Sequence, residues 1–95
     1  MTEKYVWVFS DSWSDYDLPQ LFSSKRKALK KLKEEFNYTM DYFSCYLTDE
    51  EKQIIRKRFE ADKEFFCIDI IKHDLYGFEK LINTRSCSIS KELIY

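Results

Sequence analysis

The stretch that decides the fold is residues 10–24, SDSWSDYDLPQLFSS, which joins an aromatic segment to a lysine-rich one. Its serine and aspartate side chains can bond to nearby backbone groups, which favours a turn in a chain with only one glycine and one proline. Residues 17–22 then predict a short strand that returns beside the preceding one. Because Pro19 cannot donate a hydrogen bond to a sheet, this strand should lie at an edge or at a bulge.

Two longer strands are predicted on either side of a helical middle. Residues 5–9 combine valines with aromatic residues, which suit a pleated surface, and both faces are apolar, which favours a central strand. Residues 65–72 form the second such segment, in which Phe66, Ile68 and Ile70 share one face.

The end of the chain is less regular. Gly77 is the natural site for a positive φ after the second long strand. Residues 78–82 fit either a strand or a short helical turn. We expect a loop at residues 83–86 and a last strand over residues 87–95, where serines alternate with larger residues.

The segment that follows Ser23 predicts a long amphipathic helix over residues 24–46, with Ser23 or Ser24 as its N-cap. Apolar residues recur at intervals of three and four, which is typical of a helix face packed on a core. These residues are Leu29, Leu32, Phe36, Met40 and Phe43.

A second helix is predicted over residues 49–62. Thr48 followed by Glu51 matches a capping box, in which each side chain bonds to the other residue's backbone N–H. Its expected buried edge consists of Ile54, Ile55 and Phe59.

Length and composition indicate a single α+β domain spanning residues 1–95. The chain is 44% hydrophobic and 35% charged, as in a globular protein, and 18% of its residues are aromatic. We expect a small, mainly antiparallel β-sheet with two helices packed on one face. A core of this size does not need seventeen aromatic residues, so some of them should lie at the surface.

The first third of the chain resembles small bacteriophage-encoded proteins of unknown function. The matching motifs are Ser14-Asp15-Tyr16, Phe22-Ser23-Ser24-Lys25 and Lys27-Ala28, and residues 65–74 fit more loosely. Pro19 and a longer helical middle depart from the pattern. The resemblance implies a phage or prophage origin and the host cytoplasm as location, but it carries no active site over to this chain.

An acidic and aromatic group of residues surrounds the predicted turn: Asp11, Trp13, Asp15, Tyr16 and Asp17. In one interpretation the aromatic rings fold back onto the sheet. In the other the group is a protein-binding loop, because tryptophan and tyrosine are good interface anchors and aspartates can pair with basic residues of a partner.

A basic group opens the first predicted helix: Lys25, Arg26, Lys27, Lys30 and Lys31, with Lys33 close behind. Such a run is commonly a solvated face. The alternative is an anion-binding or nucleic-acid-binding site, for a phosphate backbone or an acidic protein surface.

Residues for catalysis or metal binding are sparse. The single histidine, His73, precedes Asp74, but neighbouring strand residues point to opposite faces and make a poor catalytic pair. Three cysteines without a CxxC motif predict free thiols and no zinc site. We therefore expect no catalytic residues, no metal and no cofactor.

The sequence thus favours a non-enzymatic, phage-derived binding protein that inhibits or modulates a host protein, for example in a defence system such as CRISPR. One alternative is a nucleic-acid-binding accessory protein that uses the basic helix. Another is a protein that sequesters a nucleotide signal with Trp13, Tyr16 and the basic residues. No membrane partner is expected, nucleic acid is not the favoured partner, and the oligomeric state is open, a homodimer included.

Overall fold

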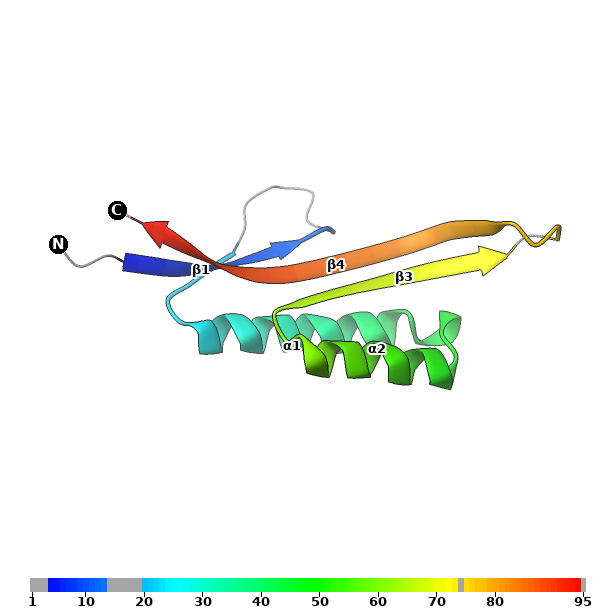
Figure 1. Cartoon of the computed structure of the whole chain (residues 1–95), viewed down its shortest axis with the longest axis horizontal. Helices are drawn as coiled ribbons and strands as arrows, with labels where there is room; N and C mark the ends of the chain where they lie inside the picture. Colours follow the sequence, from blue (N-terminus) through cyan, green and yellow to red (C-terminus); the bar gives the residue numbers. More distant parts are fainter. Residues whose placement is uncertain (1–3, 14–19, 74, 95) are drawn as a thin grey trace.

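The computed structural model describes residues 4–13, 20–73 and 75–94, which form the predicted α+β fold. The four strands of these residues make one antiparallel sheet in the order β2-β1-β4-β3, with both helices against it (Figure 1). Along the chain the elements are β1 (Lys4–Asp11), β2 (Gln20–Phe22), α1 (Lys25–Tyr42), the 3₁₀ turn η1 (Ser44–Tyr46), α2 (Asp49–Ala61), β3 (Phe65–His73) and β4 (Glu79–Ile94).

The N-terminal strand β1 is central, as predicted. It pairs with β2 on one side, where Trp7 lies opposite Phe22, and with β4 on the other, where Phe9 lies opposite Ile89. The described part of the predicted second strand, β2, is at the edge of the sheet, one of the two positions that the sequence allowed. The remaining residues of that prediction, 17–19, lie outside the described part of the chain.

The hydrophobic core lies between the sheet and α1. The predicted apolar stripe of this helix is confirmed, because all its members except the half-buried Leu29 are buried. Ser24 is the N-cap, since its hydroxyl accepts a hydrogen bond from the Lys27 amide. The sheet side of the core consists of Phe9, Phe66, Ile68, Ile70, Cys87 and Ile89.

The predicted first helix is too long at its C-terminal end. It ends at Tyr42, and the chain tightens into η1, where the Tyr46 amide donates to the Phe43 carbonyl three residues back. This change of pitch keeps Phe43 buried and brings Thr48 into position to start α2.

Helix α2 begins with the predicted capping box between Thr48 and Glu51. Its predicted buried edge is wrong at Ile54, which is 52% exposed. The reason is position: α2 packs along β3, the edge strand, so only one side of it meets the rest of the protein. That contact is aromatic, with Phe59 stacked on Phe36 of α1 at 4.1 Å between ring centroids.

The last strand is much longer than predicted. Residues 83–86, expected as a loop, lie inside the sixteen-residue β4, which begins at Glu79 and follows the turn at Gly77 with its φ of 82°. The polar residues of this segment are compatible with a strand because β4 has hydrogen-bonded neighbours on both sides and because the charge of Arg85 is compensated inside the protein.

The hairpin of β3 and β4 extends past the ends of both helices, at the right of Figure 1. A β-bulge marks the departure, because Ile70 pairs with Asn83 and Ile71 with Leu81, which leaves Ile82 without a partner across the ladder. The molecule is therefore elongated, with extents of 62 × 25 × 17 Å.

Candidate binding surfaces

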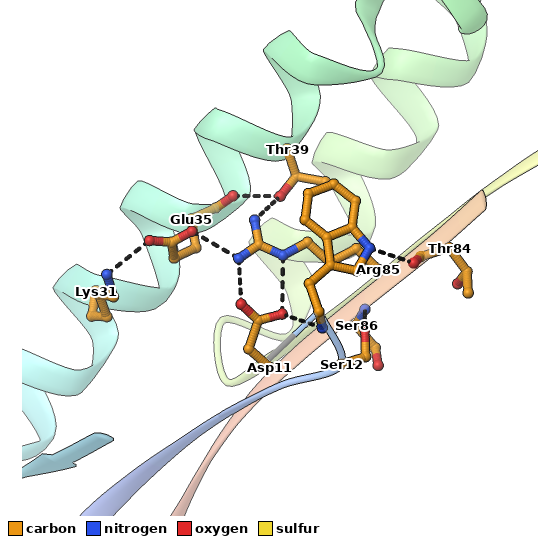
Figure 2. A network of polar contacts seen from close by, with 9 residues as sticks. Asp11, Ser12, Lys31, Glu35, Thr39, Thr84, Arg85 and Ser86 are labelled. Carbon is orange, nitrogen blue, oxygen red and sulfur yellow. Dashed lines mark hydrogen bonds and ion pairs between the residues drawn. The ribbon is translucent and has the colours of Figure 1, made fainter. Parts of the chain in front are cut away.

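A buried arginine connects three elements of the fold (Figure 2). Arg85 of β4 is 4% exposed and donates to both carboxylate oxygens of Asp11 at the end of β1, from Nε at 3.1 Å and from Nη2 at 2.5 Å. It also donates to two side chains of α1, the Glu35 carboxylate at 2.8 Å and the Thr39 hydroxyl at 2.7 Å. Lys31 pairs with Glu35 as well, so that two cations face two carboxylates.

The network fixes the ionisation of its members. Burial alone would raise the pKa of Asp11, but the hydrogen bonds from Arg85 and from the Trp13 amide outweigh it and hold that pKa below its ordinary value. The pKa of Glu35 is lowered in the same way, against its own burial, by Lys31 and Arg85. Arg85 stays charged because its two carboxylate partners raise its pKa despite burial.

The indole of Trp13 closes this network from the side of β1. Its ring lies over the guanidinium of Arg85 at 4.6 Å, and its Nε1 donates to the Thr84 carbonyl at 2.8 Å. Its edges meet the rings of Tyr42 and Phe43 at centroid distances of 5.3 and 5.6 Å. Trp13 is thus half-buried and packed against the core.

The predicted acidic and aromatic loop is only partly described. Asp11 and Trp13 both take part in the Arg85 network, so their charge and indole N–H have partners within the protein. Asp15, Tyr16 and Asp17 lie outside the described residues. Binding of a protein or a nucleotide by this loop stays a prediction.

The predicted basic group is divided between two sides of α1. Three of its members have partners within the protein: Lys25 pairs with Glu64, Lys27 bonds to the Ser23 hydroxyl and Lys31 pairs with Glu35. The other two, Arg26 and Lys30, line a groove between α1 and α2.

Sequence reasoning missed an exposed apolar surface at the far end of the β3–β4 hairpin. Leu75 is fully exposed, and Phe78 and Leu81 are 70% and 55% exposed. We call this surface the apolar arm and define it as Ile71, Leu75, Tyr76, Phe78, Leu81 and Ile82. The sequence feature that could have predicted this surface is the group of large apolar residues on both sides of Gly77, which is more than two short strands packed on a core would bury.

No family model, curated protein or solved structure matches this chain. Its function must therefore be inferred from its own residues.

Two of the three cysteines, Cys67 and Cys87, have raised thiol pKa values, which disfavours the reactive thiolate. Burial raises the pKa of the Cys87 thiol to about 12, and Cys67, which is exposed, also has a raised pKa because of desolvation and the nearby Asp69. Within the described part of the chain, no three histidine, cysteine or acidic side chains gather as metal ligands would. None of the helices described is both long enough and apolar enough to cross a bilayer.

Proposed function

We propose that this protein is a non-enzymatic binding protein that docks onto another protein through the apolar arm. One observation carries the proposal: large apolar side chains stand exposed together on a hairpin that projects beyond the helices. Monomeric soluble proteins rarely expose contiguous apolar patches of large size, and such patches commonly mark interaction sites. Aromatic residues within the patch are the type enriched at the centres of protein interfaces.

The partner in this proposal is a host protein, and the effect of binding is inhibition or modulation of it. The resemblance to bacteriophage-encoded proteins supports a host partner, for example a component of a defence system such as CRISPR. The pairing of β3 with β4 up to His73 and Glu79 suits this role, because paired strands lose little further chain entropy when their side chains are covered.

The test is capture of host proteins with two matched variants. The double variant Leu75→Ser and Leu81→Ser removes two apolar side chains from the arm, whereas Leu21→Ser removes a leucine that is 63% exposed from the edge strand β2. We expect the wild-type protein and Leu21→Ser to retain the same host protein in a pull-down, and the double variant to lose it while keeping its circular dichroism spectrum.

Retention of that protein by the double variant would show that the arm is not the docking surface.

The captured host protein should be purified and its affinity for the wild type and for the double variant measured by titration. For an arm centred on such anchors, the double variant should weaken binding by about 10-fold or more, as expected for residues at the centre of an interface.

A further inference from the structure

The groove between α1 and α2 has an apolar floor. It has a volume of about 740 Å³, and its floor consists of the half-buried Leu29 and Phe59 and of Phe36, whose buried ring stacks on that of Phe59. Because α1 and α2 run lengthwise side by side in opposite directions (Figure 1), the groove follows both helices. An apolar floor of this kind favours an occupant with apolar side chains of its own.

The rim of the groove is strongly basic. Five cations line it, against one carboxylate, Glu60: they are Arg26, Lys30, Lys33, Arg56 and Lys63. All five are exposed, and among the described residues none of their side chains forms an ion pair or a hydrogen bond. Their charge is therefore available to a ligand, unlike that of Lys25 and Lys31 on the same helix.

The cations are spread along the groove rather than gathered at a point. Arg26, Lys30 and Lys33 follow one face of α1, and with Asn37 they span about 16 Å at a helical rise of 1.5 Å per residue. Arg56 and Lys63 stand seven residues apart on the opposite side. A single phosphate could meet only a few of these groups, so the spacing fits an extended anionic ligand of about three helical turns.

We propose that this groove binds an acidic amphipathic helix of a partner protein. Such a helix places apolar residues on the floor and carboxylates against both basic rims, the arrangement of a helix bound in a groove. The incomplete burial of α2 supports a protein ligand rather than a nucleic acid, because this helix has no buried residue. A third helix would cover Phe59 on the groove floor, whereas a phosphate backbone would leave this ring exposed to water.

The experiment uses synthetic peptides of about 15 residues, the length of a marginal helix in water. One carries leucines at helical spacing with glutamates on either side, and a second has the same composition with the leucines moved off that spacing. We expect the first to bind the full-length protein at least about 10-fold more tightly by fluorescence anisotropy, and binding to weaken as salt screens the rim. Backbone NMR shifts should map to residues 26–37 and 56–63.

Charge reversal provides the matched control. Lys30→Glu or Arg56→Glu should weaken peptide binding by about 10-fold, whereas Lys57→Glu, an equal charge change on the part of α2 that does not line the groove, should leave it within about 2-fold. The arm variant Leu75→Ser and Leu81→Ser should bind the peptide like the wild type, so that this proposal and the docking of the arm can fail separately.

Three results would overturn the proposal: equal binding of the two peptides, no binding of the first at about 1 mM, or equal effects of Lys57→Glu and Lys30→Glu. Tighter binding of a single-stranded or duplex oligonucleotide, abolished by Lys30→Glu and with log affinity falling linearly with log salt, would instead identify a nucleic-acid site.

Discussion

Arg85 holds β4, β1 and α1 together through a single side chain. Replacing it by methionine keeps the apolar stem but leaves Asp11 and Glu35 without their shared cation in a largely buried site. We expect the free energy of unfolding to fall by about 3 kcal/mol, as when one partner of a buried ion pair is removed. Urea unfolding measures the change, and Lys80→Met, on the exposed part of the same strand, should cost less than about 0.5 kcal/mol. Equal losses in the two variants would contradict this role.

The same network predicts how stability depends on pH. Since the pKa values of Asp11 and Glu35 are lower in the folded protein than their ordinary values of 3.8 and 4.5, the carboxylates stabilise the fold fully above about pH 5. That contribution is lost as the pH falls through 4.5 and 3.8 toward the lower folded-state values. Urea midpoints measured between about pH 3 and 7 should therefore decline on the acid side.

The decline should be shallower in Asp11→Asn than in the wild type, because this variant no longer has the carboxylate to protonate. Asp41→Asn, an exposed position on α1, should reproduce the wild-type profile. Superimposable profiles of Asp11→Asn and the wild type would show that the ion pair does not set the acid stability.

At the scale of the elements, the stability of α2 depends strongly on the capping of its N-terminus. It buries no residue completely, so the capping box of Thr48 and Glu51 forms a large share of what holds it helical. Thr48→Ala should lower the free energy of local unfolding of α2 by about 1 kcal/mol. Amide exchange in residues 49–61 should then be about 5-fold faster, while the exchange rates in α1 stay the same. Hydrogen exchange measured by NMR tests this, and Gln53→Ala, which leaves the cap intact, should not speed exchange. Equal acceleration in α1 would mean that the helices open together.

The elements also show what sequence patterns can and cannot predict. The α1 stripe and both caps were predictable because a helix period and a capping residue are local signals. Residues 83–86 in β4 were not, because asparagine, threonine and serine favour loops, and the partners that keep Arg85 buried lie 46 to 74 positions away. Ile54 was misplaced for a similar reason: its spacing fits a core, but only the fold shows that α2 lies at the sheet margin.

The candidate surfaces likewise combine features that the sequence predicts with features that only the fold shows. The basic character of Arg26 and Lys30 was evident from the sequence, whereas their grouping with Arg56 and Lys63 depends on α2 returning beside α1. The apolar arm is likewise exposed because β3 and β4 extend past the ends of the helices, which the sequence alone does not show.

At the scale of the whole molecule, the arm makes the protein longer than its size requires. The Cα radius of gyration is 16.0 Å, whereas a compact chain of this length would have about 12 Å. Small-angle X-ray scattering of the monomer should give a value near the larger figure, and the variant Leu75→Ser and Leu81→Ser should not change it. A value near the smaller one would mean that the arm folds back in solution. If the wild-type protein has twice the monomer mass in solution and the double variant has the monomer mass, the arm binds a second copy of this protein.

The length of β4 has a consequence for how the protein is made. This strand lies between β1 and β3, so within the described sheet the pair of β1 and β2 is not joined to β3 without residues 79–94. While the ribosome is still adding these residues, the emerging chain can form its helices, which need only local contacts, but it cannot close the sheet or give Asp11 its arginine. Until then the core side of α1 lacks its partners on β4, Cys87 and Ile89, and a chaperone that shields exposed apolar surface could bind the chain in this interval.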